Sequence, residues 1–149
     1  MELKSLLVDS KTTWVEFPGL DGFEVELANL SRKELVALRK RCTTNKFNRK
    51  TRAFEESLED EKFVKEFTLA TVKGWKGLQL NYLEDLVLVN LQGQDGTKEL
   101  PFTIDNALQL VENSSEFDNW LNEVVFDLDN FRTKRKEPTP RKVAKVSED

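Results

Sequence analysis

The chain has 149 residues, which suffices for one domain with a single hydrophobic core and is too short for a second full domain. Charged residues make up 34% of it and hydrophobic residues 38%, with a formal net charge of −4, a balance that excludes a membrane-embedded and a wholly disordered protein. Histidine, the usual general base and zinc ligand, is absent, so we expect no enzyme activity, no metal and no cofactor.

The N-terminal segment does not have the pattern of a secretion signal. Its only apolar run, residues 6–8, is three residues long, and Glu2 and Asp9 lie close to it. No apolar run reaches the roughly 20 residues that a membrane-spanning helix needs. Cys42 is the only cysteine, which excludes an internal disulfide. We therefore expect a cytoplasmic protein.

The first structural signal is a β-hairpin at residues 12–27. Residues 12–17 and 23–27 are two runs typical of strands, and residues 18–22 between them contain the proline and glycines of a turn. The second run alternates apolar with acidic residues, so one face of the predicted hairpin packs on the core.

The first helix is predicted to begin at Ser31. Ser31 and Glu34 have the spacing of a capping box, in which each residue satisfies a backbone N–H of the other. We expect this helix to run to about Cys42. Residues 43–50 are polar and basic, and they are expected to form a loop or a weak helical extension.

The middle of the chain predicts two more helices. Apolar residues at helical spacing extend from Phe54 to Val72, and the glycines on either side of Trp75 are expected to end that helix. Residues 78–91 predict a short third helix, although the apolar run at 86–89 is equally typical of a strand.

The last two helices are indicated by their caps. Residues 92–98 are expected to form an exposed loop, Thr103 is placed to cap a fourth helix, and Ser114 or Ser115 a fifth. Together the elements predict an α+β fold that is mainly α, with a small N-terminal β-hairpin packed on a bundle of about four to five short helices.

The fifth helix has the clearest amphipathic pattern, with apolar residues every three or four positions up to Phe131. In a domain of this size the stripe is expected mainly to join the core. The alternative is that part of it forms a groove for a helix of another protein. The anchors would then be Phe117, Trp120, Val124 and Leu128, because large apolar side chains dominate interface energies.

The composition changes after Phe131, where lysines, arginines and prolines accumulate. Residues 133–149 are predicted to form a flexible charged tail, and residues 1–132 a single globular binding domain. The tail has no aromatic residue for base stacking and follows an acidic domain, so we expect no binding to nucleic acid.

The order of these features resembles that of the tail assembly chaperones of long-tailed, siphovirus-like bacteriophages. The resemblance covers about residues 14–132. It rests on the hairpin, the start of the first helix, the amphipathic last helix and three short motifs, which are VKGWKGL at 72–78, LPFT at 100–103 and NAL at 106–108. It marks Trp75 and Phe102 as matching positions and further candidates for partner contact, although Trp75 is expected mainly to plug the core.

The resemblance implies a function without catalysis. Chaperones of this family bind the tape measure protein, keep it soluble and help to recruit tail tube subunits before they leave the growing tail. It therefore implies these two partners, a location in the host cytoplasm and absence from the mature virion. Self-association and a longer frameshifted product stay open. So do two other functions, a structural tail or virion adaptor and a small nucleic-acid-associated regulator that uses the basic tail.

Overall fold

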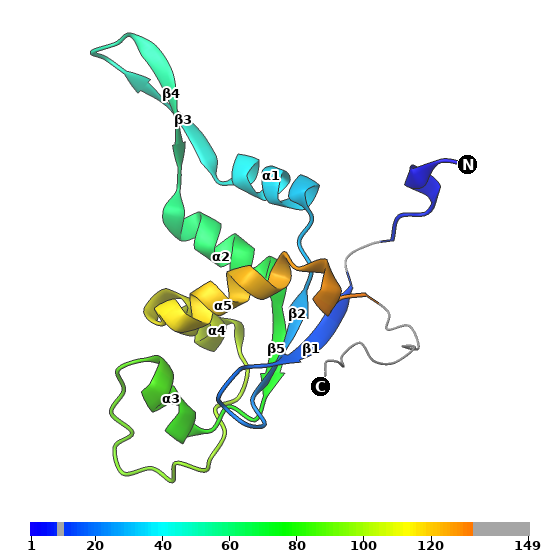
Figure 1. Ribbon diagram of the computed structural model, residues 1–149. Coiled ribbons are helices and arrows are strands. Elements are labelled where there is room, and N and C mark those ends of the chain that lie inside the picture. The colour runs from blue at the N-terminus through cyan, green and yellow to red at the C-terminus, as the bar shows by residue number, and fades with distance from the viewer. Residues whose placement is uncertain (9–10, 133–149) are drawn as a thin grey trace, which may run out of the picture.

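Residues 1–8 and 11–132 are described by the structure, a computed structural model shown in Figure 1. Over these residues the fold is α+β and mainly α, which confirms the predicted fold class. The predicted tail at 133–149 lies outside the described residues. In chain order the elements are η1 (Leu3–Ser5), β1 (Thr12–Glu16), β2 (Glu24–Ala28), α1 (Arg32–Arg41), β3 (Thr43–Asn48), β4 (Ala53–Leu58), α2 (Asp60–Thr71), β5 (Val72–Lys76), α3 (Leu80–Leu86), α4 (Ile104–Asn113), α5 (Ser115–Val125) and η2 (Leu128–Asn130).

The predicted N-terminal hairpin is confirmed, but it belongs to a larger sheet. β1 and β5 pair antiparallel with opposite edges of β2, so that Val25 faces Val15 on one side and Trp75 on the other. The prediction that the glycines on either side of Trp75 end the second helix is wrong, because the helix ends at Thr71 and residues 72–76, Gly74 included, form a strand. The free edge of β2 satisfies the backbone of β5, and a local pattern does not reveal such a distant partner.

Aromatic rings fill the space between the sheet and α5. Phe23 and Phe117 are fully buried, and their ring centroids lie 6.4 Å apart. Phe17 lies 5.7 Å from Phe23 and 6.0 Å from Phe117, and Trp75 meets Phe23 edge-on at 6.4 Å. Burying such a side chain contributes about 1.5–3 kcal/mol, so this cluster is a main link between the sheet and the helices.

α1 begins where the sequence predicts. The Ser31 hydroxyl accepts a hydrogen bond from the Glu34 backbone N–H at 3.1 Å, and the Glu34 carboxylate accepts one from the Ser31 backbone N–H at 2.8 Å. This reciprocal pair is the predicted capping box. The helix ends at Arg41, next to its predicted end.

The chain after α1 differs from the prediction. The expected loop at 43–50 and the expected helix start near Phe54 are both wrong, because β3 and β4 form an antiparallel hairpin and α2 begins only at Asp60. We call this hairpin, residues 43–58, the arm. Figure 1 shows the arm projecting away from the three-stranded sheet at one end of the molecule, whereas α3 lies at the opposite end.

A polar turn and one aromatic pair explain why the arm forms. The Asn48 side-chain oxygen accepts hydrogen bonds from the N–H groups of Lys50 at 2.8 Å and Thr51 at 3.3 Å, which closes the turn. Phe47 then faces Phe54 across the two strands. Phe54 is four residues before the apolar Leu58. Because this spacing also places two side chains on one face of a helix, the sequence pattern predicts a helix where the structure has a strand.

The later elements follow the predictions more closely. The third helix forms over Leu80–Leu86, and residues 86–89 form no strand in this described part of the chain. Residues 92–98 contain turns and are mostly exposed, as predicted. The Thr103 side chain accepts a hydrogen bond from the Asn106 backbone N–H at 2.9 Å, which confirms it as the cap of α4.

The last apolar stripe is not one continuous helix. α5 ends at Val125, and a 3-10 turn follows at Leu128–Asn130. The Asp127 carboxylate accepts a hydrogen bond from the Asp129 N–H at 3.0 Å, and the Asn130 amide donates one to the Val124 carbonyl at 3.1 Å. These short polar side chains compete with the helical backbone bonds and end the helix.

Ser114, rather than Ser115, caps α5. Its hydroxyl is buried and accepts a hydrogen bond from the Phe117 N–H at 3.1 Å. We expect Ser114→Ala to lower the free energy of unfolding by about 1–2 kcal/mol, because a buried N–H loses its acceptor. Urea denaturation measures this change. The neighbouring Ser115→Ala, at an exposed helical position, is the control and should change stability by less than about 0.5 kcal/mol; equal losses would contradict the assignment of the cap.

Candidate partner-binding surface

The four predicted anchors of the last helix do not form one exposed stripe. Phe117 is fully buried, Val124 is nearly so, and Trp120 is half-buried. The structure brings Trp120 and Phe117 together, with ring centroids 5.7 Å apart, and Phe17 lies 4.9 Å from Trp120. Leu128, in η2, is 55% exposed. In this fold a partner reaches Leu128 and part of Trp120, whereas Phe117 belongs to the core.

The two positions marked by the family resemblance lie against each other. Trp75 is buried in β5, and the Phe102 ring meets it edge-on at a centroid distance of 5.1 Å. The Trp75 indole N–H donates a hydrogen bond to the Leu100 carbonyl at 2.9 Å. These contacts attach the segment before α4 to the sheet.

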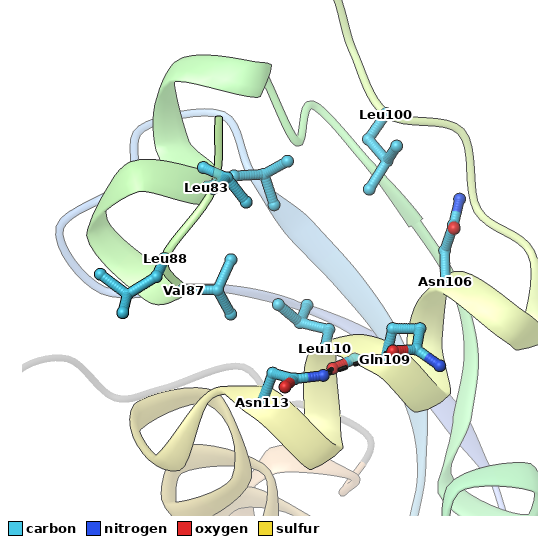
Figure 2. A pocket seen from close by; sticks show the side chains of 9 residues that line it. Leu83, Val87, Leu88, Leu100, Asn106, Gln109, Leu110 and Asn113 are labelled. Carbon is cyan, nitrogen blue, oxygen red and sulfur yellow. Dashed lines mark hydrogen bonds between the residues drawn. The ribbon is translucent and has the colours of Figure 1, made fainter. Parts of the chain in front are cut away.

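An open, mostly apolar pocket of about 460 Å³ lies between α3 and α4. Figure 2 shows side chains of both helices facing across it, with Leu100 contributed by the segment before α4. An Asn113 side chain that donates hydrogen bonds to Gln109 supplies part of the polar wall. The complete lining is Leu83, Val87, Leu88, Val89, Leu100, Leu110, Asn106, Gln109 and Asn113.

Backbone hydrogen bonds join the segment before α3 to the segment before α4. The Leu100 N–H donates to the Leu78 carbonyl at 2.7 Å, and the Leu80 N–H donates to the Lys98 carbonyl at 2.8 Å, so the two ends of the long loop are joined. Directly after α3, Val87 still packs against the core, whereas the next residue, Leu88, is fully exposed. The sequence patterns do not predict this pocket. The one hint is the apolar run at 86–89, whose last two residues stay exposed.

No protein-family model, curated protein or solved structure matches the chain. The family resemblance therefore rests on the quoted motifs and the order of the elements, and any function must be argued from the surfaces themselves.

The arm presents a second apolar surface. Phe47 is 54% exposed and Phe54 is 73% exposed, and their ring centroids lie 5.4 Å apart. At the base of the arm, a more polar hollow of about 580 Å³ separates it from α1 and is lined by residues such as Arg39, Lys40 and Glu56.

Charge is strongly segregated along the described fold, and this pattern was not among the sequence-based predictions. Residues 32–52, from α1 to the turn of the arm, contain nine lysines and arginines and one acidic residue, Glu34. Residues 77–131, which include α3, α4 and α5, contain eleven aspartates and glutamates and one basic residue, Lys98. The net charge of −4 conceals this separation because the two regions largely cancel.

Within 1–8 and 11–132, no three His, Cys, Asp or Glu side chains are grouped as a metal site would require. None of the helices in that part of the chain is long and apolar enough to cross a membrane.

The Thr97 hydroxyl and backbone N–H donate to the Asp95 carboxylate at 2.7 and 2.9 Å, which lowers the pKa of Asp95 and fixes an exposed turn.

Proposed function

We propose that this chain is a non-enzymatic tail assembly chaperone that binds an amphipathic helix of a phage tape measure protein in the pocket between α3 and α4. By covering such helices it would keep the tape measure protein soluble and help to bring tail tube subunits to it. The observation that carries the proposal is the open apolar pocket with the fully exposed Leu88 at its edge. The motif resemblance supplies the identity of the partner.

The chemistry of the pocket suits a helix. Helix-in-groove recognition uses apolar anchors three or four residues apart, and the pocket offers leucine and valine side chains from two elements to receive them. The amides of Asn106, Gln109 and Asn113 add hydrogen-bonding groups that fix the orientation of a bound segment. A pocket of this size binds only a few side chains, so a growing tail can displace the chaperone.

The exposed charges of α3 and α4 indicate which kind of tape measure segment the pocket binds. Glu84 and Asp85 in α3 and Glu112 in α4 are exposed on the helices that form the pocket. A tape measure segment with lysine or arginine next to its apolar anchors therefore fits better than an acidic one, because opposite charges favour encounter.

The test is co-expression with the tape measure protein of the same phage, with soluble yield and co-purification as readouts. We expect a soluble complex with the wild-type chain. Leu88→Asp should weaken it about tenfold or more, because a buried leucine contributes about 1.5–3 kcal/mol and aspartate resists burial. The fold should be unaffected, since Leu88 is exposed.

Leu128→Asp is the matched control. It makes the same chemical change at another exposed leucine, on the surface that the last helix would use. Retained binding with Leu88→Asp and lost binding with Leu128→Asp would move the site to the end of α5. An insoluble tape measure protein, or recovery of the chain in purified mature particles at fixed copy number, would contradict the chaperone function and favour a virion adaptor.

A further inference from the structure

The arm exposes apolar surface that its own fold does not cover. A two-stranded hairpin is marginally stable in water by itself, and here the two aromatic rings that hold its strands together are themselves largely exposed. Glu55 and Glu56 make β4 acidic, and Glu55 lies opposite Lys46 of β3, but the exposed turn that joins the strands carries the cations Arg49 and Lys50. A surface with two aromatic rings beside a basic turn fits a partner that is apolar at its centre and acidic on the side that meets the turn.

The same chain carries a surface with those properties at its opposite end. The pocket between α3 and α4 is apolar, and the region that forms it contains a single basic residue among many acidic ones. Figure 1 shows the arm and α3 at opposite ends of the molecule. Because a flat view can only shorten a distance, the two are at least as far apart in space as they look. An arm therefore does not reach the pocket of its own copy.

We propose that the arm of one copy docks onto the α3–α4 end of a second copy, with Phe47 and Phe54 covering the apolar pocket and the basic turn facing its acidic surroundings. Both kinds of complementarity, charge and apolar surface, point to the same pair of sites. Because the contact joins two different surfaces, one contact leaves a free pocket on one copy and a free arm on the other. Assembly then continues beyond the dimer unless the two copies exchange arms or a ring closes.

This inference concerns the free chain and stands independently of the tape measure protein. Where both proposals hold, the arm of a neighbouring copy and the client helix compete for one pocket, and self-association keeps that apolar surface covered until a client arrives. A failure of self-association leaves the co-expression result untouched, and the reverse is also true, so the two proposals fail separately.

The experiment measures mass by sedimentation velocity of the full chain across a dilution series, at low and high salt. We expect oligomers that dissociate on dilution and at high salt, because exposed charges are screened. Phe47→Ser/Phe54→Ser should raise the dissociation constant about tenfold or more, since the rings no longer become buried. A wild-type chain that is monomeric at every concentration would overturn the proposal.

A charge exchange gives the sharper result. Arg49→Glu/Lys50→Glu reverses the charge of the turn of the arm, and Glu84→Lys/Asp85→Lys reverses two charges of α3, the helix on one side of the pocket. All four positions are exposed, so folding should be preserved. Each variant alone should be monomeric, whereas an equal mixture should associate again, because every arm then meets a pocket of opposite charge. A mixture that stays monomeric would overturn the proposed contact.

The matched control is Lys62→Glu/Lys65→Glu, which makes the same change in net charge at exposed positions of α2. It should associate like the wild type, and loss of association there would mean that net charge alone governs assembly. Single-stranded DNA provides the remaining test. Tight binding by a monomeric wild type, lost on reversal of the arm, would assign the arm to nucleic acid and overturn docking on a second copy.

Discussion

Gly77→Ala is expected to lower the free energy of unfolding by more than ~3 kcal/mol. Gly77 has a positive φ of 75°, which alanine adopts only with strain. A Cβ atom at this position would also lie 2.8 Å from the carbonyl carbon of Gly22, and closer still to its oxygen. Both neighbours are backbone, so the clash is relieved only by moving β5 away from the hairpin turn.

Gly19→Ala separates these two causes. Gly19 also has a positive φ, 87°, but a Cβ atom there would meet nothing within 4 Å. Its substitution should therefore cost about 1 kcal/mol, the conformational term alone. Urea denaturation of the two variants measures the difference, and equal losses would mean that β5 does not pack closely against the turn at Gly22.

Trp75→Ala is expected to destabilise the fold by about 3–5 kcal/mol. The indole is 7% exposed, packs edge-on against Phe23 and Phe102, and donates its N–H to the Leu100 carbonyl. Removing it leaves a large cavity where the sheet meets the segment before α4. Thermal and urea unfolding should both report the loss.

Trp14→Ala provides the matched control because it removes the same side chain from the edge strand of the same sheet. Trp14 is 44% exposed, and the Lys76 ammonium lies 4.6 Å from its ring centroid. A loss of about 1 kcal/mol is expected. If Trp75→Ala instead left stability intact and abolished only partner binding, Trp75 would be a partner anchor rather than a core residue.

The helix starts at Ser31, Thr103 and Ser114 were predictable because an N-cap is a local device. A side-chain oxygen meets a backbone N–H two or three residues later, so the spacing in the sequence contains the whole interaction. The N-terminal hairpin was predictable for a similar reason, since a turn of proline and glycine joins two runs with the alternation of a strand.

The errors arose where a distant partner decides the structure. Residues 72–76 follow a helix without a break in the apolar pattern, and they become a strand because the edge of β2, nearly 50 residues earlier, accepts them. In the arm, the spacing of Phe54 and Leu58 fits a helix as well as a strand, and pairing with β3 decides between them.

The class of fold, the caps of three helices and the first hairpin follow from the sequence alone, because they depend on neighbours along the chain. It marked Trp75 and Phe102 but not their contact, and it offered Phe117 as an anchor although that ring lies in the core. Which apolar residues stay exposed follows only from the packing of the folded chain. Burial depends on what packs above a residue, so the pocket between α3 and α4, and the separation of the basic arm from it, emerge only when distant segments meet in space.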